Sequence, residues 1–581
     1  MSDVLSVLAS SLNDTQLAAA ARRLKNSTVN GGNRSAALTA LIELARSQKR
    51  MAVLICANAF DVARLNQEIA WLDPSLKVSS LPDWETLPYD TMSPHADLVS
   101  ERLETLYNLT SDDLQARPDV LIAAASTAAQ RFAPKSYVAG NTFFFRKGQT
   151  ISIGKLETSL VAAGYGRVEQ TMAPGEFAVR GGIVDIFPMG AATPLRLDLF
   201  DDEIDAIRRF DPESQRSTGS VDRVRILPGH EFAFDEESRN RFRAAWRAAF
   251  PGDPNKCPVY VDVGSGICSP GIEYYLPLFF ESTGTLADYL PDNALFITLG
   301  ETRDAIDSFM RQTQERYKFL SHDAQRPALP PEKLFDKADS FFDAIAPFGR
   351  ISLKAPETGI DTSLTIERSA KDPAAKLKDF VAKCRIEKKR ILIVATGSGR
   401  AARLQELLRD GVREPELVES FAAFVNGSEP LAIAVGPLSG GFVLEEPGLV
   451  IITESELYNT KAIIRRRGHN RTTNVEAIIR DVSELREGDP VVHAAHGVGR
   501  YHGLETISTE EGPAEFVRID YANDAKLFVP VSQLNLISRY TGADSEHAPL
   551  NNLGRGDWEK ARKKAAQKVR DLSLIHISEP T

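Results

Sequence analysis

Two continuous apolar runs do most to constrain the fold of this chain. Residues 51–57 (MAVLICA) and 119–124 (DVLIAA) lack the polar–apolar alternation of a half-exposed strand. A strand of this kind is covered on both faces, as in a parallel sheet. Helical patterns at 35–47, 61–71 and 96–109 alternate with these runs, so the sequence predicts a βα fold of the nucleotide-binding type.

The phosphate site of such a fold is missing from the expected position. The turn before the first helix reads Asn30-Gly31-Gly32-Asn33-Arg34-Ser35, whereas a phosphate loop needs glycines followed by Lys and Ser/Thr. Gly397-Ser398-Gly399-Arg400 follows a strand at 391–395 and is a candidate anion cradle at a helix N-terminus. The Lys-Ser/Thr pair is again missing, so we favour a plain connecting turn.

Residues 136–212 have the texture of an antiparallel β domain inserted into the α/β domain. Its short strands, 177–180, 183–187 and 194–200, are separated by glycine- and proline-containing turns. Three acids follow the last strand at 201–203, and we interpret them as a solvated turn rather than a metal site.

A chain of 581 residues exceeds what one hydrophobic core supports, so we expect several domains. The α/β domain is expected in two parts around the β domain, and a second, accessory α/β domain follows. The predicted boundaries are 1–135 and 213–345 for the first α/β domain, 136–212 for the β domain, 350–458 for the accessory domain, 459–484 for a basic linker, 485–545 for a small β-barrel and 555–572 for a linker helix.

The small β-module is predicted from period-two alternation. Val517, Ile519 and Tyr521 alternate with charged residues, Asn523-Asp524 supplies a turn, and the alternation resumes at 527–529. Together with short upstream strands and glycine bends, this pattern predicts a compact Tudor/SH3-like barrel.

The formal net charge of −10 argues against a protein coated with basic surface for DNA binding. Two local basic patches remain as possible DNA-proximal sites, with a solvated surface as the alternative interpretation. They contain Arg465, Arg466 and Arg467, and Lys563 and Lys564.

Four scattered cysteines without a CxxC motif indicate neither a disulfide framework nor a zinc site. No apolar run is long enough to cross a bilayer, and the N-terminus does not resemble a signal peptide. We therefore expect a cytoplasmic protein without a membrane partner.

Three longer motifs carry a family resemblance. GEFAVRGGIVDIFPMG (175–190) and LPDWETLPYDTMSPHADLVSERL (81–103) resemble the module that the bacterial transcription-repair coupling factors (Mfd) share with the excinuclease subunit UvrB. YANDAKLFVPVSQLNLISRY (521–540) resembles the RNA-polymerase-interacting domain of the same family. The motifs occur in the family's order, and the resemblance extends nearly to Leu572.

The resemblance implies two binding sites. Arg167, Phe177 and Arg180 match positions that bind UvrA, although a neighbouring arginine of UvrB is Ala178 here. The alternative for Arg180 is a plain ion pair with Asp185. The family's β-module docks on the RNA polymerase β subunit through an exposed strand, which we place at 504–507, with Leu504 and Ile507 as contacts.

The resemblance also implies an activity. Full-length members are ATP-dependent double-stranded DNA translocases of helicase superfamily 2, which use ATP and Mg, recognise stalled RNA polymerase and recruit UvrA for nucleotide excision repair. The motor is expected beyond the helix at Trp558, so we expect no catalytic residue, cofactor or metal in this chain. Residues 573–581 read SLIHISEPT, depart from the family and are expected to be an artefactual tail. The alternative function is that of a non-catalytic polymerase-binding adaptor, or a transcription regulator acting as this fragment alone.

Overall fold

The structure is a computed structural model, and it describes residues 27–30, 34–111, 116–321, 323–354, 364–366, 372–409, 414–444, 448–458, 488–493, 497–509, 512–522, 525–530, 537–539 and 550. It divides into two compact units, Met1–Arg465 and Arg466–Thr581, and each is considered by itself.

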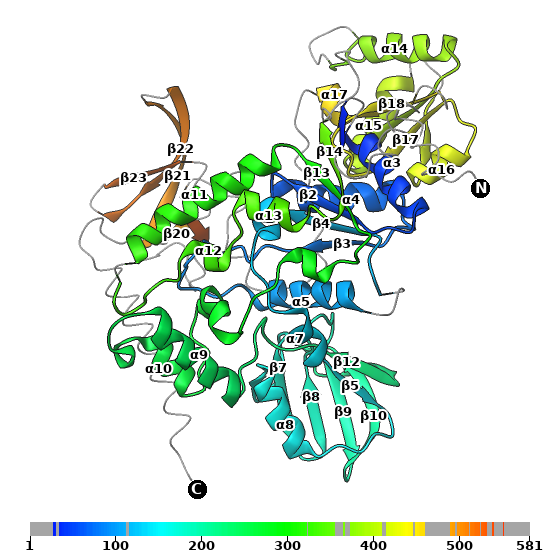
Figure 1. Cartoon of the computed structure of the whole chain (residues 1–581). Coiled ribbons are helices and arrows are strands. Elements are labelled where there is room, and N and C mark those ends of the chain that lie inside the picture. The colour runs from blue at the N-terminus through cyan, green and yellow to red at the C-terminus, as the bar shows by residue number, and fades with distance from the viewer. Residues whose placement is uncertain are drawn as a thin grey trace. The chain divides into compact units, whose positions relative to one another are not determined.

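The first α/β domain is built on a six-stranded parallel sheet (Figure 1). The strand order is β1-β14-β13-β2-β4-β3. The bounds are β1 Ser27–Asn30, β2 Ala52–Cys56, β3 Val78–Leu81, β4 Val120–Ala124, β13 Leu295–Leu299 and β14 Gly349–Lys354. Since β14 pairs with both β1 and β13, this domain extends past its expected end at residue 345.

Both faces of this sheet are covered, as the apolar runs predict. Val53 and Ile55 of β2 face a core shared with helices α5 (Ala96–Thr110) and α11 (Thr302–Leu320). Leu54 and Cys56 face a second core with α3 (Arg34–Ser47) and α4 (Phe60–Leu72).

Further helices complete the domain. They are α6 Ala125–Ala128, α7 Lys135–Gly140, α9 Glu236–Ala249, η1 Pro254–Lys256, α10 Pro258–Gly264, η2 Ile272–Phe279, η3 Leu286–Tyr289, α12 Pro331–Leu334 and α13 Ala338–Ala344.

The inserted β domain holds a six-stranded sheet of order β11-β10-β9-β8-β7-β6 and a two-stranded sheet of β12 with β5. All pairs are antiparallel except β6 with β7. The strands run past the expected boundary at 212, because β11 and β12 pair with β10 and β5. The bounds are β5 Phe143–Arg146, α8 Ile153–Ala162, β6 Gly166–Arg167, β7 Glu176–Arg180, β8 Ile183–Ile186, β9 Leu195–Phe200, β10 Glu203–Phe210, β11 Ser217–Val221 and β12 Arg223–Ile226.

The accessory domain has a five-stranded sheet of order β16-β17-β15-β19-β18, in which only β18 is antiparallel. The bounds are α14 Ala375–Ile386, β15 Arg390–Ala395, α15 Ser398–Arg409, β16 Glu416–Val418, α16 Phe421–Asn426, β17 Leu431–Val435, β18 Phe442–Leu444, β19 Leu449–Thr453 and α17 Glu454–Tyr458.

In the second unit, five strands form an antiparallel sheet of order β23-β22-β21-β20-β24. Val517, Ile519 and Tyr521 are buried, and β22 and β23 form the expected hairpin. A Cβ on Gly499 would lie 2.5 Å from Cγ2 of Ile519, so this position requires glycine. Closure into a Tudor/SH3-like barrel stays a prediction. The bounds are β20 Pro490–His493, β21 Gly497–Thr509, β22 Gly512–Asp520, β23 Lys526–Pro530 and β24 Ile537–Arg539.

A buried ion pair joins the exit of the β domain to the first α/β domain. Arg102 on α5 donates to both carboxylate oxygens of Glu231, with Nε–Oε1 at 2.6 Å and Nη2–Oε2 at 3.2 Å. Nε1 of Trp84 donates to the same carboxylate at 3.0 Å. Both charged side chains are almost fully buried, so removal of either one would leave the other as a buried, unpaired charge.

We predict that Glu231→Ala destabilises the chain by about 3–5 kcal/mol, because it leaves the Arg102 charge buried and unpaired. Urea denaturation followed by circular dichroism measures the change. Glu237→Ala is the control, since it removes an exposed partner of Arg241 and is expected to cost less than about 1 kcal/mol. Equal effects of the two substitutions would contradict the structural role of the buried pair.

Candidate partner-binding face of the β domain

One face of the β domain presents a row of paired side chains. Ala178, Asp185, Arg196 and Arg208 are partners across β7, β8, β9 and β10, so their side chains lie on the same face. The opposite face, with Phe177, Ile186 and Leu195, packs into the core.

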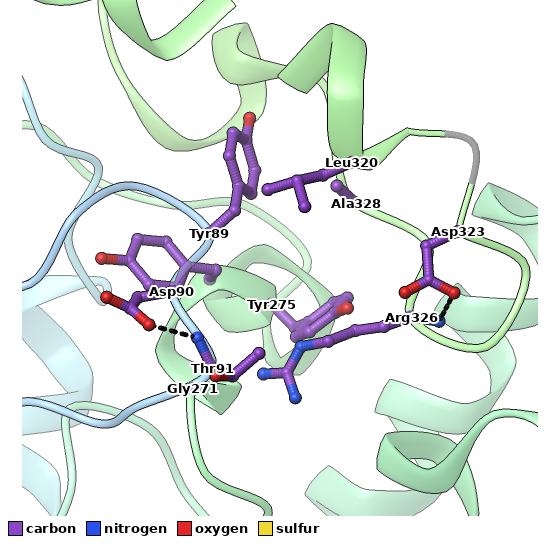
Figure 2. A pocket seen from close by; sticks show the side chains of 10 residues that line it. Tyr89, Asp90, Thr91, Gly271, Tyr275, Leu320, Asp323, Arg326 and Ala328 are labelled. Atoms are coloured by element: carbon purple, nitrogen blue, oxygen red, sulfur yellow. Dashed lines mark hydrogen bonds between the residues drawn. The ribbon is translucent and has the colours of Figure 1, made fainter. Parts of the chain in front are cut away.

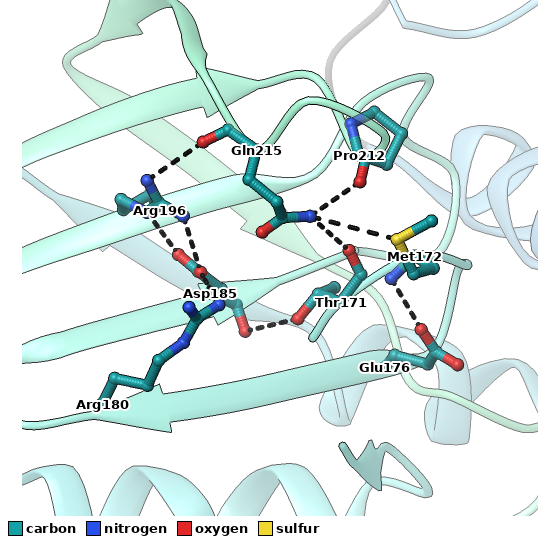
Figure 3. A network of polar contacts seen from close by, with 8 residues as sticks. All are labelled: Thr171, Met172, Glu176, Arg180, Asp185, Arg196, Pro212 and Gln215. Atoms are coloured by element: carbon teal, nitrogen blue, oxygen red, sulfur yellow. Dashed lines mark hydrogen bonds and ion pairs between the residues drawn. The ribbon is translucent and has the colours of Figure 1, made fainter. Parts of the chain in front are cut away.

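Within this row, Asp185 contacts two arginines, Arg180 and Arg196, as Figure 3 shows. Its carboxylate is almost fully buried and accepts two hydrogen bonds from the Arg196 guanidinium, at 2.7 and 2.8 Å. This paired geometry is the strong form of an arginine–carboxylate contact. The hydrogen bond to Asp185 raises the pKa of Arg196, whose guanidinium also lies over the Phe210 ring.

Arg180 reaches the same carboxylate through a single contact of 3.2 Å from Nη2. Its side chain is 53% exposed, whereas that of Arg196 is largely covered. Because Arg196 already neutralises Asp185, the single contact positions the Arg180 guanidinium and leaves its other N–H groups available to a partner. A positioned, exposed guanidinium is suited to binding a carboxylate of a partner.

The loop ahead of β7 is fixed beside this face (Figure 3). Gln215 donates through Nε2 to the carbonyl groups of Pro212 and Thr171, at 2.7 and 3.3 Å. Glu176 accepts the backbone N–H groups of Met172 and Ala173, at 2.8 and 2.9 Å. These bonds hold the exposed Met172 on an ordered loop.

Sequence reasoning missed two exposed apolar residues here, Met172 and Ile183. Ile183 is the ladder partner of Arg180 and lies on the Asp185 face. The exposure of Ile183 could have been inferred from the strand period, because Ile183 and Asp185 are two residues apart and lie on one face. An arginine among exposed apolar side chains has the composition of an interface hot spot.

The expected UvrA-binding residues do not share one face. Phe177 is 0% exposed and belongs to the core beneath the arginines, and a role for it in UvrA binding stays a prediction. Arg167 is 62% exposed and lies 3.2 Å from Glu157. It is the ladder partner of Phe177, so it lies on the opposite face from Arg180, near the β6 edge.

The other predicted positions lie in the second unit or near its start. Leu504 is 46% exposed on β21. Residues 504–509 of β21 pair with β22, whereas β20 pairs with residues 497–500, so within the described strands this stretch has pairing on one side. The side chain of Ile507 lies outside the described residues, as do Arg465, Arg466, Arg467, Lys563, Lys564 and the segments 555–572 and 573–581.

A small pocket of about 70 Å³ lies elsewhere in the first unit (Figure 2). Its aromatic walls are Tyr89, Tyr274 and Tyr275, and Arg326 lines it as well. The three tyrosine hydroxyls donate to the carbonyl groups of Leu329, Leu87 and Pro327. These hydroxyls are engaged in structural hydrogen bonds, and we assign no reaction to this pocket.

Within the described residues, no cluster of three or more His, Cys, Asp or Glu side chains is arranged to hold a metal ion. A search of the same part of the chain finds no helix with the length and apolar character needed to span a membrane.

Comparison with known families matches three of these regions. The UvrB interaction domain matches residues 143–232, the MFD D3 domain matches 380–457, and the CarD-like/TRCF RID domain matches 485–541. These are the β domain, most of the accessory domain and the β-module.

Similarity to individual proteins extends over nearly all of this chain and includes all three regions. The transcription-repair-coupling factors of Haemophilus influenzae and Escherichia coli are 37% identical to this chain, covering 92% and 93% of it and 47% of each relative. That of Bacillus subtilis is 26% identical, covering 95% of the chain and 48% of the relative.

This combination defines a multidomain protein that joins a UvrB interaction domain to a RID domain. The chain is similar to the transcription-repair-coupling factors over nearly all of its own length, and it spans about half the length of the relatives it matches.

We predict an unusual pH dependence from Glu273, beside the pocket. Burial raises its pKa to about 7, despite a hydrogen bond from Ser93. Its ionisation therefore costs stability progressively as the pH rises from about 4.5 to 7. Glu273→Gln removes this cost. The unfolding free energy of the variant minus that of wild type should therefore increase by on the order of 2–3 kcal/mol as the pH rises from 4 to 8.

His230 contributes with the opposite sign, because burial lowers its pKa to about 4 and stability is then lost as the pH falls below about 6.5. Subtracting the unfolding free energy of wild type from that of the variant at each pH cancels this term. The exposed Glu281→Gln is the control, and a pH-independent difference for Glu273→Gln would contradict the expectation.

Proposed function

We propose that this chain recognises stalled RNA polymerase and recruits UvrA, thereby coupling transcription to nucleotide excision repair. The observation that carries the proposal is the presence of a UvrB interaction domain and a CarD-like/TRCF RID domain in one chain that is similar to transcription-repair-coupling factors.

The UvrA-binding surface is proposed at the β6–β7 edge of the β domain. Arg180 approaches from the Asp185 face and Arg167 from the other, with Met172 and Ile183 adding apolar area. The Asp185–Arg196 pair fixes the strand beneath Arg180, so little side-chain freedom has to be lost when a partner binds.

The polymerase-binding surface is proposed at residues 504–507 of β21, with the β subunit as the partner. A strand of the partner can add to the one-sided stretch by backbone hydrogen bonds, and the exposed Leu504 adds an apolar contact.

We further propose that the whole protein is an ATP- and Mg-dependent double-stranded DNA translocase. Residues 30–35, ahead of and at the start of α3, do not fit ATP, because they lack the lysine of a phosphate loop. This feature favours a second candidate for the chain acting alone, a non-catalytic adaptor. ATP turnover by the purified chain would exclude that candidate.

Arg180→Ala is predicted to weaken UvrA binding about 30-fold, corresponding to about 2 kcal/mol for an interface arginine. Arg180→Lys should recover little, because an ammonium lacks the planar fork. Titration calorimetry with purified UvrA measures both. Arg209→Ala, an exposed arginine one residue from Arg208 and on the other face, should bind as wild type. Unchanged affinity for Arg180→Ala would refute the placement.

Leu504→Asp is predicted to weaken capture of RNA polymerase at least tenfold, by placing a charge on the proposed docking strand. Phe528→Asp on β23 is the matched control, since this ring is 37% exposed on an outer strand of the same sheet. Pull-down with polymerase core enzyme compares the two. Loss of capture with Phe528→Asp alone would move the docking site to β23.

A further inference from the structure

Helix α4 of the first α/β domain carries a set of contacts to the accessory domain. Nε1 of Trp71 donates to the carbonyl group of Val435, at 3.1 Å, and its ring lies 5.9 Å from that of Phe421. Leu72, the last residue of α4, is fully buried in the core of the accessory sheet. An end of one domain is thus built into the core of the other.

Glu68 is the polar centre of this contact. It is fully buried, and its carboxylate accepts three hydrogen bonds at 2.8–3.1 Å: from Ser35 Oγ, from Arg64 Nη1 and from the backbone N–H of Ser439. Arg64 also donates to Ser439 Oγ at 2.6 Å. One buried carboxylate therefore holds α3, α4 and the loop after β17 together. Such a charge is stable only while all its partners stay in place.

The contact between Ser35 and Glu68 also occupies the position of a phosphate site. Ser35 is the second residue of α3 and follows Gly31-Gly32 in the sequence, at a position where a phosphate-binding fold uses a hydroxyl to hold Mg. Here the hydroxyl donates to a carboxylate instead. A negative charge on the Glu68 carboxylate, in hydrogen-bond contact with Ser35, would repel a phosphate group bound at this position.

A buried carboxylate also lies beside the glycine turn of the accessory domain, at residues 397–400. Glu454 is almost fully buried and accepts the backbone N–H of Thr396 at 2.8 Å, and Arg400 on the first turn of α15 donates to the same carboxylate. The candidate anion cradle at 397–400 thus already faces a carboxylate of the protein.

We propose that α4 is a docking surface for the accessory domain, with Glu68 as its hub, and that the two α/β domains act as one rigid body. The Ser35 hydroxyl, which stands where this type of fold binds a nucleotide, serves here as part of a joint between domains.

Gly436 offers a sharp test, because it lies against the Trp71 ring. A Cβ at this position would lie 2.5 Å from Cε2 and 2.9 Å from Nε1 of Trp71. Gly436→Val should therefore act as a wedge between the domains. Gly397→Val is the matched control: it lies in the same domain, and no atom lies within 4 Å of its added Cβ.

Hydrogen–deuterium exchange of the full chain, read by peptide, measures the effect. In Gly436→Val we expect at least tenfold faster exchange for peptides covering 60–72 and 435–441, with exchange of β15 (390–395) unchanged because the accessory core stays folded. Gly397→Val should match wild type. Wild-type exchange at both interface peptides in Gly436→Val would overturn the proposal.

Glu68→Ala and Trp71→Ala test the same joint from the other domain and keep the proposal falsifiable if the wedge unfolds the accessory domain. Each should speed exchange at 435–441 while β15 stays protected. Unchanged exchange at 435–441 in both variants would show that the contact does not hold the domains together, and would overturn the proposal irrespective of the wedge.

Discussion

The buried ion pair between Arg102 and Glu231 is the constraint on which the rest of the first unit depends. An inserted domain is joined to its host at two chain crossings, and this pair lies at the second of them, with Trp84 completing the hydrogen bonding. Because neither charge can be solvated while the chain is folded, the exit of the β domain is held against α5. The candidate UvrA-binding face is thereby carried by a fixed support.

Buried carboxylates held by several donors recur at two other places, one within the β domain and one between the two α/β domains. Asp185 is held by the fork of Arg196 beneath the exposed Arg180, and Glu68 is held by Arg64, Ser35 and Ser439 between the two α/β domains. In each case a buried carboxylate is satisfied by donors from different elements. The arrangement gives rigidity where the proposed function needs it: under a binding face, and between domains that must move together.

The sequence predicted those features that depend on local patterns. The runs at 51–57 and 119–124 correctly indicated strands covered on both faces, and the alternation from Val517 to Tyr521 correctly indicated a half-buried strand in a hairpin. It did not predict the return of β14 to the first sheet, nor the burial of Phe177, because both depend on which strands pair. The Glu68 hub joins residues 371 positions apart, which no local pattern records.

We propose that one chain binds UvrA and RNA polymerase at the same time, through separate surfaces. The most direct test is bridging: immobilised UvrA is incubated with the chain and then with polymerase core enzyme, and retained polymerase is quantified. The account predicts retention that requires the chain and increases with its amount until UvrA is saturated. Polymerase that is never retained, although UvrA holds the chain, would contradict it.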